Sequence, residues 1–268
     1  MSILGFIGVG NMGGALATAA RRTLSGGQVW LANRTAIKAE ALAAVLDCTC
    51  STNQEIAARA DYIFLGVKPQ MMAGLLTELS PVLAARTSRF VLVSMAAGLT
   101  TADICRLAGG DYPVLRIMPN TPASVGAGML LYAPGSGVTE AETEEFLRAM
   151  AAAGRFTRLE EHLIDAGTSV SGCGPAFVDL FIEALADGGV LCGLPRAAAL
   201  ELAAQMVLGS AQLVLESGEH PGQLKDQVCS PGGSTIVGVR ALEDGNFRAT
   251  VMGAVIAAFE KNKGLGKS

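Results

Sequence analysis

Three glycines near the start of the chain, Gly8, Gly10 and Gly13, are spaced as G-x-G-x-x-G. The apolar run 3–7 precedes them, and the alanine-rich stretch 15–22 that follows is typical of a helix. In such a unit the first glycine permits the tight turn, the second lets a pyrophosphate approach the backbone, and the third lets helix and strand pack closely. The pattern predicts a dinucleotide held at the helix N-terminus, with an ordinary glycine-rich turn as the alternative.

The segment Asn33-Arg34-Thr35 follows the next predicted strand, 28–32. An NAD site places an acidic residue here, about 20 residues beyond the glycines, to bind the ribose 2′-hydroxyl. This chain has no acid at the position. Asn33 and Thr35 offer hydrogen bonds, and Arg34 offers a cation suited to a 2′-phosphate, so the segment predicts NADPH with NADH less preferred. A solvated arginine in a turn is the alternative.

Two further strands end in residues that could line a site. Lys68 follows the apolar run 62–67, and the small residues 96–98 follow the run 90–94. Ligands of open α/β sheets lie beyond the carboxyl ends of the strands. We therefore expect Lys68 and the loop 96–98 to line the nicotinamide half of the site, although Lys68 as a plain surface lysine is equally compatible with its position.

A second glycine-rich stretch, 230–235, reads Ser-Pro-Gly-Gly-Ser-Thr and precedes a predicted helix. Backbone N–H groups at such a helix start form a cradle for an anion, which here would be a substrate carboxylate. A capped turn is the alternative. The helix after Pro175 also carries Asp179, Glu183 and Asp187 at i, i+4 and i+8, which indicates a solvated face or a field that favours a cationic substrate.

The distribution of basic residues bears on the reaction. No lysine lies between Arg158 and Lys225, and the histidines are His162 and His220. An alcohol dehydrogenase needs a base beside the hydroxyl, commonly Lys or His. Hydride addition to a protonated imine needs no such base, so the sequence favours an imine reductase over an alcohol dehydrogenase.

Strands and helices alternate through residue 159, and only helices are predicted beyond it. We expect an α/β protein with a doubly wound, Rossmann-type NADP-binding domain at 1–159 and an all-α substrate-binding and dimerisation domain at 160–268. The C-terminal helices are apolar on several faces, which predicts burial against a second subunit.

Composition limits the function classes. Half of the 268 residues are hydrophobic, but no unbroken apolar run approaches a membrane span, and the start of the chain lacks the charged region of a signal peptide. The net charge is −4 without a basic cluster, which argues against nucleic acid. The six cysteines lack paired metal-ligand spacing. We expect a cytoplasmic protein with reduced thiols, no metal and no membrane or nucleic-acid partner.

Over essentially its whole length the chain resembles the pyrroline-5-carboxylate reductase family. The resemblance rests on the first glycine motif, the stretch 67–69, the Met-Pro-Asn-Thr-Pro loop 118–122, the segments 171–176 and 186–190, and above all the long signature 221–243. Cys173, where the family usually has Ser, and Phe177, where Tyr is common, depart from the pattern. If the family's serine contacts ligand directly, that contact is in doubt here.

The resemblance implies the site residues. NADPH would be held by Ile7, Gly8, Val9, Gly10, Asn11, Met12, Asn33, Arg34, Asn53, Gly66, Val67, Lys68, Met95, Ala96 and Ala97. The substrate 1-pyrroline-5-carboxylate would lie on Gly232, Gly233, Ser234 and Thr235, in a homodimer of interlocked C-terminal helices that often assembles into a decamer. The hydroxyl of Thr235 is the candidate catalytic group, as hydrogen-bond partner or proton source. Another NADP enzyme, such as a β-hydroxyacid dehydrogenase or a different imine reductase, and a non-catalytic NADP sensor are the competing hypotheses.

Overall fold

The computed structural model describes residues 2–264. By their contacts these residues form two compact units, one of 2–173 with 258–264 and one of 174–257. We call them the sheet unit and the helical unit. The domain boundary expected between residues 159 and 160 rests on the change from alternating strands to helices, and it stays a prediction.

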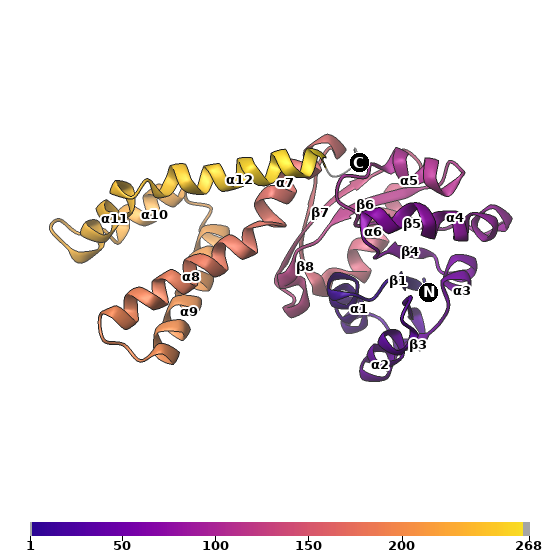
Figure 1. The fold of residues 1–268 in the computed structure, drawn as a ribbon, viewed down its shortest axis with the longest axis horizontal. Coiled ribbons are helices and arrows are strands. Elements are labelled where there is room, and N and C mark those ends of the chain that lie inside the picture. The colour runs from indigo at the N-terminus through magenta and orange to yellow at the C-terminus, as the bar shows by residue number, and fades with distance from the viewer. Residues whose placement is uncertain (1, 265–268) are drawn as a thin grey trace. The chain divides into compact units, whose positions relative to one another are not determined.

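The sheet unit is built on eight strands in the order β3-β2-β1-β4-β5-β6-β7-β8 (Figure 1). From β3 to β6 the strands are parallel, in the order typical of dinucleotide-binding domains; β7 runs antiparallel to β6, and β8 parallel to β7. The predicted doubly wound α/β class is confirmed. The strands are β1 Leu4–Ile7, β2 Val29–Ala32, β3 Thr49–Cys50, β4 Tyr62–Leu65, β5 Val91–Ser94, β6 Val114–Met118, β7 Gly128–Pro134 and β8 Gly154–Arg158.

Helices cover both faces of this sheet, because the buried strands are apolar on both sides. One face packs against α1, α2 and α6, and the other against α3, α4 and α5. The helices are α1 Asn11–Thr23, α2 Ala36–Leu46, α3 Asn53–Arg59, α4 Pro69–Ala85, α5 Thr101–Ala108, α6 Glu140–Ala149 and α7 Ile164–Ser171.

Two local predictions need correction. The helix expected at 71–79 extends over Pro69–Ala85, with Pro81 inside it. Its buried leucines continue to Leu83, and their packing against the sheet outweighs the hydrogen bond that the proline cannot make. The loop around Asn120 contains a short 3₁₀ helix, Thr121–Val125.

The helical unit leaves most of its apolar side chains uncovered. On α8 and α9, only the small residues Ala186, Ala199 and Ala203 are buried, whereas Leu180, Leu208 and others are exposed. This exposure agrees with the predicted apolar faces. The helices are α8 Gly174–Leu191, α9 Arg196–Ser217, α10 Pro221–Gln227, α11 Ser234–Asp244 and α12 Phe247–Gly264, the last of which continues into the sheet unit.

Two helical stretches, Glu161–Leu191 and Arg196–Ser217, are long and apolar enough to cross a membrane by length and composition alone. Their mean hydropathies are 1.3 and 1.5, and 11% of each window is buried. A search for an unbroken apolar run misses them because scattered carboxylates interrupt both. Helices of this kind also form subunit interfaces, so the observation by itself is weak evidence for a membrane.

One carboxylate of the sheet unit is tightly engaged. Glu142, in the first turn of α6, accepts from Arg89 Nε at 2.6 Å and from the backbone N–H of Thr139 at 2.8 Å. These contacts, chiefly the Arg89 guanidinium, lower the pKa of Glu142 from 4.5 to about 2. The carboxylate thus joins the α6 N-terminus to the start of β5.

We expect Glu142→Gln to lower the free energy of unfolding by about 1 kcal/mol at pH 7, since the partner Arg89 is half exposed and solvent screens the pair. The folded pKa is depressed, so this stability is present above the unfolded pKa and is lost as the pH falls from about 5 towards 2. Urea unfolding of both proteins across this range measures the difference. Glu144→Gln, an exposed carboxylate on the same helix, is the control. A gap that stayed constant with pH would contradict the assignment.

Candidate functional site

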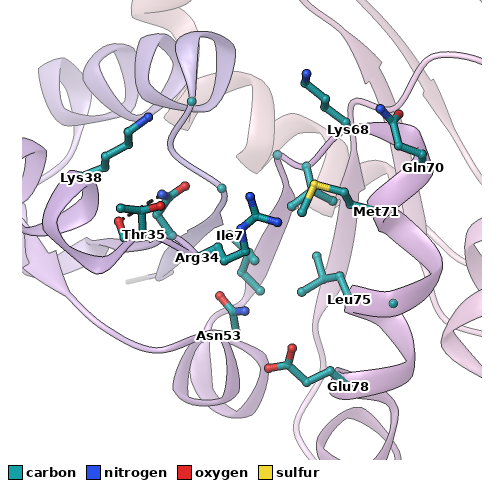
Figure 2. Close-up of a pocket in the computed structure, with 16 residues that line it drawn as sticks. Ile7, Arg34, Thr35, Lys38, Asn53, Lys68, Gln70, Met71, Leu75 and Glu78 are labelled. Atoms are coloured by element: carbon teal, nitrogen blue, oxygen red, sulfur yellow. Dashed lines mark hydrogen bonds between the residues drawn. The ribbon is translucent and has the colours of Figure 1, made fainter.

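A pocket of about 540 Å³ opens at the carboxyl ends of β1, β2 and β4 (Figure 2). Between β1 and β4 the strand order reverses, which is where ligands bind in open α/β sheets. The pocket walls come from the turn after β1, the loop after β2, the start of α3, the turn after β4 and one face of α4. The fold therefore brings together segments that lie far apart in the sequence.

Glycines create the floor of this pocket. Gly8 has φ +99°, and a Cβ there would lie 2.6 Å from the carbonyl oxygen of Gly66. A Cβ on Gly66 would lie 2.4 Å from the Gly8 oxygen, and one on Gly13 would lie 2.0 Å from it. Gly10 has no neighbouring atom within 4 Å of its Cβ position, so the space above it is open for a ligand. Gly8 and Gly13 thus serve the turn and the close packing that the pattern predicted, and the open space at Gly10 leaves room for the predicted approach of a pyrophosphate.

Asn33 ties the loop after β2 to the glycine turn. Its Oδ1 accepts from the backbone N–H of Val9 at 3.2 Å, and its Nδ2 donates to the carbonyl oxygen of Thr35 at 3.1 Å. The N–H of Gly8 in turn donates to the Ala32 oxygen at 2.8 Å. The Asn33 amide, expected as a ligand contact, therefore also shapes the pocket wall.

Positive charge dominates the pocket lining. Arg34, Lys38 and Lys68 carry cations, and Glu78 carries the one carboxylate among the lining residues that the structure describes. Figure 2 draws no hydrogen bond from any of the three cations to the other pocket residues. Their charges are therefore available to a polyanion such as a dinucleotide with an additional phosphate.

The structure gathers nine of the predicted cofactor residues in this pocket. They are Ile7, Gly8, Gly10, Asn33, Arg34, Asn53, Gly66, Val67 and Lys68. Val9 and Asn11 line an adjoining groove between α1 and α2, and Met12 is half-buried in the first turn of α1. Residues 95–97 follow β5 outside the pocket, with Ala96 buried and its two neighbours half-buried.

The sequence patterns missed the residues that α4 contributes to the pocket lining. Gln70, Met71, Gly74, Leu75 and Glu78 line the pocket from this helix. Their spacing of three or four residues marks one helical face, but does not tell which face meets the ligand. Lys38 was also missed; it lies in the first turn of α2, and Thr35 immediately precedes that helix.

The second glycine stretch lies in the helical unit, as the start of α11. Gly232 has φ +70°, and the N–H of Gly233 donates to the Ser230 oxygen at 3.0 Å. Gly233 is the N-cap, and no side chain caps the helix. Ser234 and Thr235 are exposed in the first turn. The first N–H groups of α11 are thus left without a side-chain acceptor in the described residues, as an anion cradle requires.

Two other titratable groups of the helical unit, Asp187 and His220, have structural contacts. Asp187 of the predicted acidic stripe pairs with Arg196 at 2.5 Å, and Asp179 and Glu183 lie exposed beside Leu200. The Nδ1 of His220 accepts from the Gly222 N–H at 3.1 Å and caps α10. His220 therefore serves the local fold.

Two family models match the chain. Residues 161–265 match pyrroline-5-carboxylate reductase dimerisation, and residues 3–98 match NADP oxidoreductase coenzyme F420-dependent. The pyrroline-5-carboxylate reductase of Escherichia coli K12 is 44% identical over 268 residues, which covers 99% of this chain and 98% of that protein. The Arabidopsis thaliana protein of the same name is 45% identical over 218 residues, covering 81% of this chain and 78% of that protein.

Solved structures show the same likeness. A pyrroline carboxylate reductase of Plasmodium falciparum with NADP bound has a TM-score of 0.86 at 33% identity, covering 99% of this chain and 98% of that one. The pyrroline-5-carboxylate reductase of Coxiella burnetii has a TM-score of 0.90 at 31% identity, covering 100% and 99%.

We expect Arg34→Ala to raise the Kd for NADPH roughly 10- to 100-fold and to change the Kd for NADH less than about twofold, since a charge-assisted bond to phosphate contributes about 1.5–3 kcal/mol. Lys38→Ala should act in the same direction more weakly. Quenching of protein fluorescence or calorimetry measures both constants. Arg155→Ala, an exposed arginine outside the pocket, is the matched control. Equal losses for both cofactors would contradict a role in 2′-phosphate recognition.

Proposed function

Because the chain belongs to the pyrroline-5-carboxylate reductase family, we propose that it reduces the C=N bond of 1-pyrroline-5-carboxylate to L-proline with NADPH as the preferred reductant. The chain is an NAD(P)H-dependent oxidoreductase of proline biosynthesis. The observation that best supports the cofactor preference is the cationic pocket at the reversal of strand order, which has Arg34 where an NAD site has an acid.

The pocket residues fit the parts of NADPH. The open space at Gly10 and the N-terminus of α1 suit the pyrophosphate, and the cations of Arg34 and Lys38 suit the 2′-phosphate. Lys68 and residues 95–97, at the carboxyl ends of β4 and β5, would border the nicotinamide. When bound, this cofactor supplies a hydride from C4 of its nicotinamide.

The substrate would be held by the start of α11. The N–H groups of Ser234 and Thr235, at the start of α11, would bind its carboxylate beside Gly233, whose own N–H donates to the Ser230 oxygen, and Gly232 would allow the turn. When the imine arrives protonated, the hydroxyl of Thr235 would accept a hydrogen bond from the ring N–H; when it arrives neutral, the same hydroxyl would be the proton source for the ring nitrogen. With the cofactor bound, the imine carbon would accept the hydride in a new C–H bond while the C=N π electrons pass to nitrogen. Hydride addition to a protonated imine therefore yields proline, and the reaction needs no general base.

We further propose that the helical unit forms a homodimer through α8, α9 and α12, and that this dimer is the building block of a decamer. Leu180, Leu208, Leu215 and Met252 are among its exposed apolar side chains, and the matched family model is one of dimerisation. A second copy of the same helices covers such faces better than water does. Burial of these faces between two copies accounts for the two long apolar helices without a membrane. We place the protein in the cytoplasm and propose that it binds no nucleic acid.

The primary test of the reaction is the decay of NADPH absorbance with 1-pyrroline-5-carboxylate, with L-proline identified as the product. In this assay Thr235→Ala should lower kcat/KM ~10- to 100-fold, because one polar contact to a reacting group contributes about 1.4–3 kcal/mol. Thr235→Ser should retain most of the activity.

Thr250→Ala, which removes an exposed hydroxyl from α12, is the matched control. Unchanged kinetics in Thr235→Ala would remove this residue from the mechanism. A protein that bound NADPH but reduced no cyclic imine would be a sensor, and the proposed reaction would be wrong.

Sedimentation in detergent-free buffer should give at least a dimer. Leu208→Glu should raise the dimer Kd by roughly 100-fold, because burying a leucine contributes about 1.5–3 kcal/mol. Ile37→Glu, an exposed apolar residue on α2, is the control and should leave the mass unchanged. A wild-type protein that required detergent to stay in solution would contradict the dimer explanation of its apolar helices.

A further inference from the structure

The helix α7 occupies a special place in the chain. It belongs to the sheet unit, and the helical unit begins directly after it, at residue 174. The chain returns to the sheet unit at residue 258, within α12. All of residues 174–257, including the proposed substrate cradle, thus lie between one crossing beside α7 and one within α12.

Three polar contacts fasten α7 along its length. Arg116 of β6 donates from Nη2 to Asp165 Oδ1 in the first turn at 2.7 Å. Asn262 of α12 donates from Nδ2 to Ser169 Oγ at 3.2 Å. Asn120 donates from Nδ2 to the carbonyl oxygen of Ser171, in the last turn, at 2.9 Å.

The contacts made by Arg116 and Asn262 are connected, and both donors are buried. Arg116 is 2% exposed, although it is an arginine on a strand, and Ser169 and Asn262 are also buried. The Ser169 hydroxyl donates to the Asp165 carbonyl oxygen at 2.9 Å while it accepts from Asn262. Asp165 therefore links the contact from β6 to the contact from the returning chain.

The helix lies close against the sheet in this region. A Cβ on Gly167 would lie 2.6 Å from a methyl carbon of Leu131 on β7, so a larger residue there would displace α7. Beside Arg116, the Glu161 carboxylate lies 3.8 Å from Nη1 and accepts from the N–H of Thr101 at 2.7 Å. The start of α7 is thus held to β6, β7 and the start of α5.

Stability alone does not require this arrangement. A buried ion pair gains little over well-packed apolar side chains, because both charges lose their hydration, and here the Nε of Arg116 has no hydrogen-bond partner in the described residues. Directional hydrogen bonds do fix position and rotation, which apolar contacts leave freer. An interaction of this kind is well suited to setting the direction of a helix.

We infer that Arg116, Asp165, Ser169 and Asn262 form a clamp that ties the outgoing and returning chain to α7 and so positions the helical unit for the reaction. They are positioning residues, since none of them lines the cofactor pocket. The inference rests on the proposed function. Loosening the clamp should impair the alignment of substrate with the nicotinamide while NADPH binding persists.

The test uses the full chain with Ser169→Ala, Asn262→Ala and the double variant. Each should lower kcat/KM for 1-pyrroline-5-carboxylate by roughly 10- to 100-fold, the range expected when reacting groups shift by about 1 Å. The double variant should lose no more than the stronger single variant, because both single variants remove the bond between Asn262 and Ser169; Ser169→Ala also removes the bond from Ser169 to the Asp165 carbonyl oxygen. The Kd for NADPH should stay within about twofold of wild type. Lys261→Ala, the exposed neighbour on α12, is the matched control.

Hydrogen exchange of the α7 amides supplies a readout that needs no turnover. Exchange in residues 164–171 should accelerate in Asn262→Ala and remain at the wild-type rate in Lys261→Ala. Wild-type exchange and kinetics in the double variant would overturn the clamp, as would a parallel loss of NADPH affinity and kcat/KM, which marks general destabilisation. A wild-type protein without turnover would end the proposed function, and exchange would still decide the clamp.

Discussion

The cofactor pocket depends on the contact between two backbone turns. The carbonyl oxygens of Gly8 and Gly66 occupy space that a Cβ on the other residue would need, at 2.4–2.6 Å. Because neither position has a side chain, the turn after β1 and the turn after β4 come together at the point where strand order reverses. The helix α1, at whose N-terminus we propose that the pyrophosphate lies, and the pocket-lining helix α4 start from these two turns. A methyl group at either glycine would therefore separate the two walls of the site rather than merely strain one turn.

The sequence predicts much of the sheet unit because its signals are local. Short apolar runs give the strands, glycine spacing gives the phosphate turn, and the rule that ligands bind at carboxyl ends selects Arg34 and Lys68. The contribution of α4 was not predictable in this way. Met71 and Glu78 reach the pocket only because of the rotation of α4 on the sheet, which long-range packing determines. The end of α4 was underestimated for the same reason, since the burial of Leu83 carries the helix past Pro81.

The helical unit shows a different limit. Apolar residues on several helix faces predict burial, and on α8 and α9 only small side chains such as Ala186 and Ala203 are buried within one chain. The pattern in one sequence identifies the surface that a partner must cover. How a second copy aligns on that surface depends on the contacts between the two copies. Because the unit has little apolar interior of its own, its stability should depend on association and therefore on protein concentration. The need for a partner also explains why the two stretches Glu161–Leu191 and Arg196–Ser217 resemble membrane helices in composition.

The polar residues of the fold have a bearing on the chemistry. Asn120, in the loop that follows β6, donates from its amide to the Ser171 carbonyl oxygen and accepts from the N–H of Met129. Arg116 is committed to Asp165, and His220 caps a helix. These contacts use the side chains of Asn120, Arg116 and His220 to support the architecture. An electrophile that arrives as a protonated imine needs only to be held and aligned, which backbone N–H groups and one hydroxyl can do. A chain whose polar side chains mainly hold its helices and loops in place is thus well matched to hydride transfer onto a C=N bond.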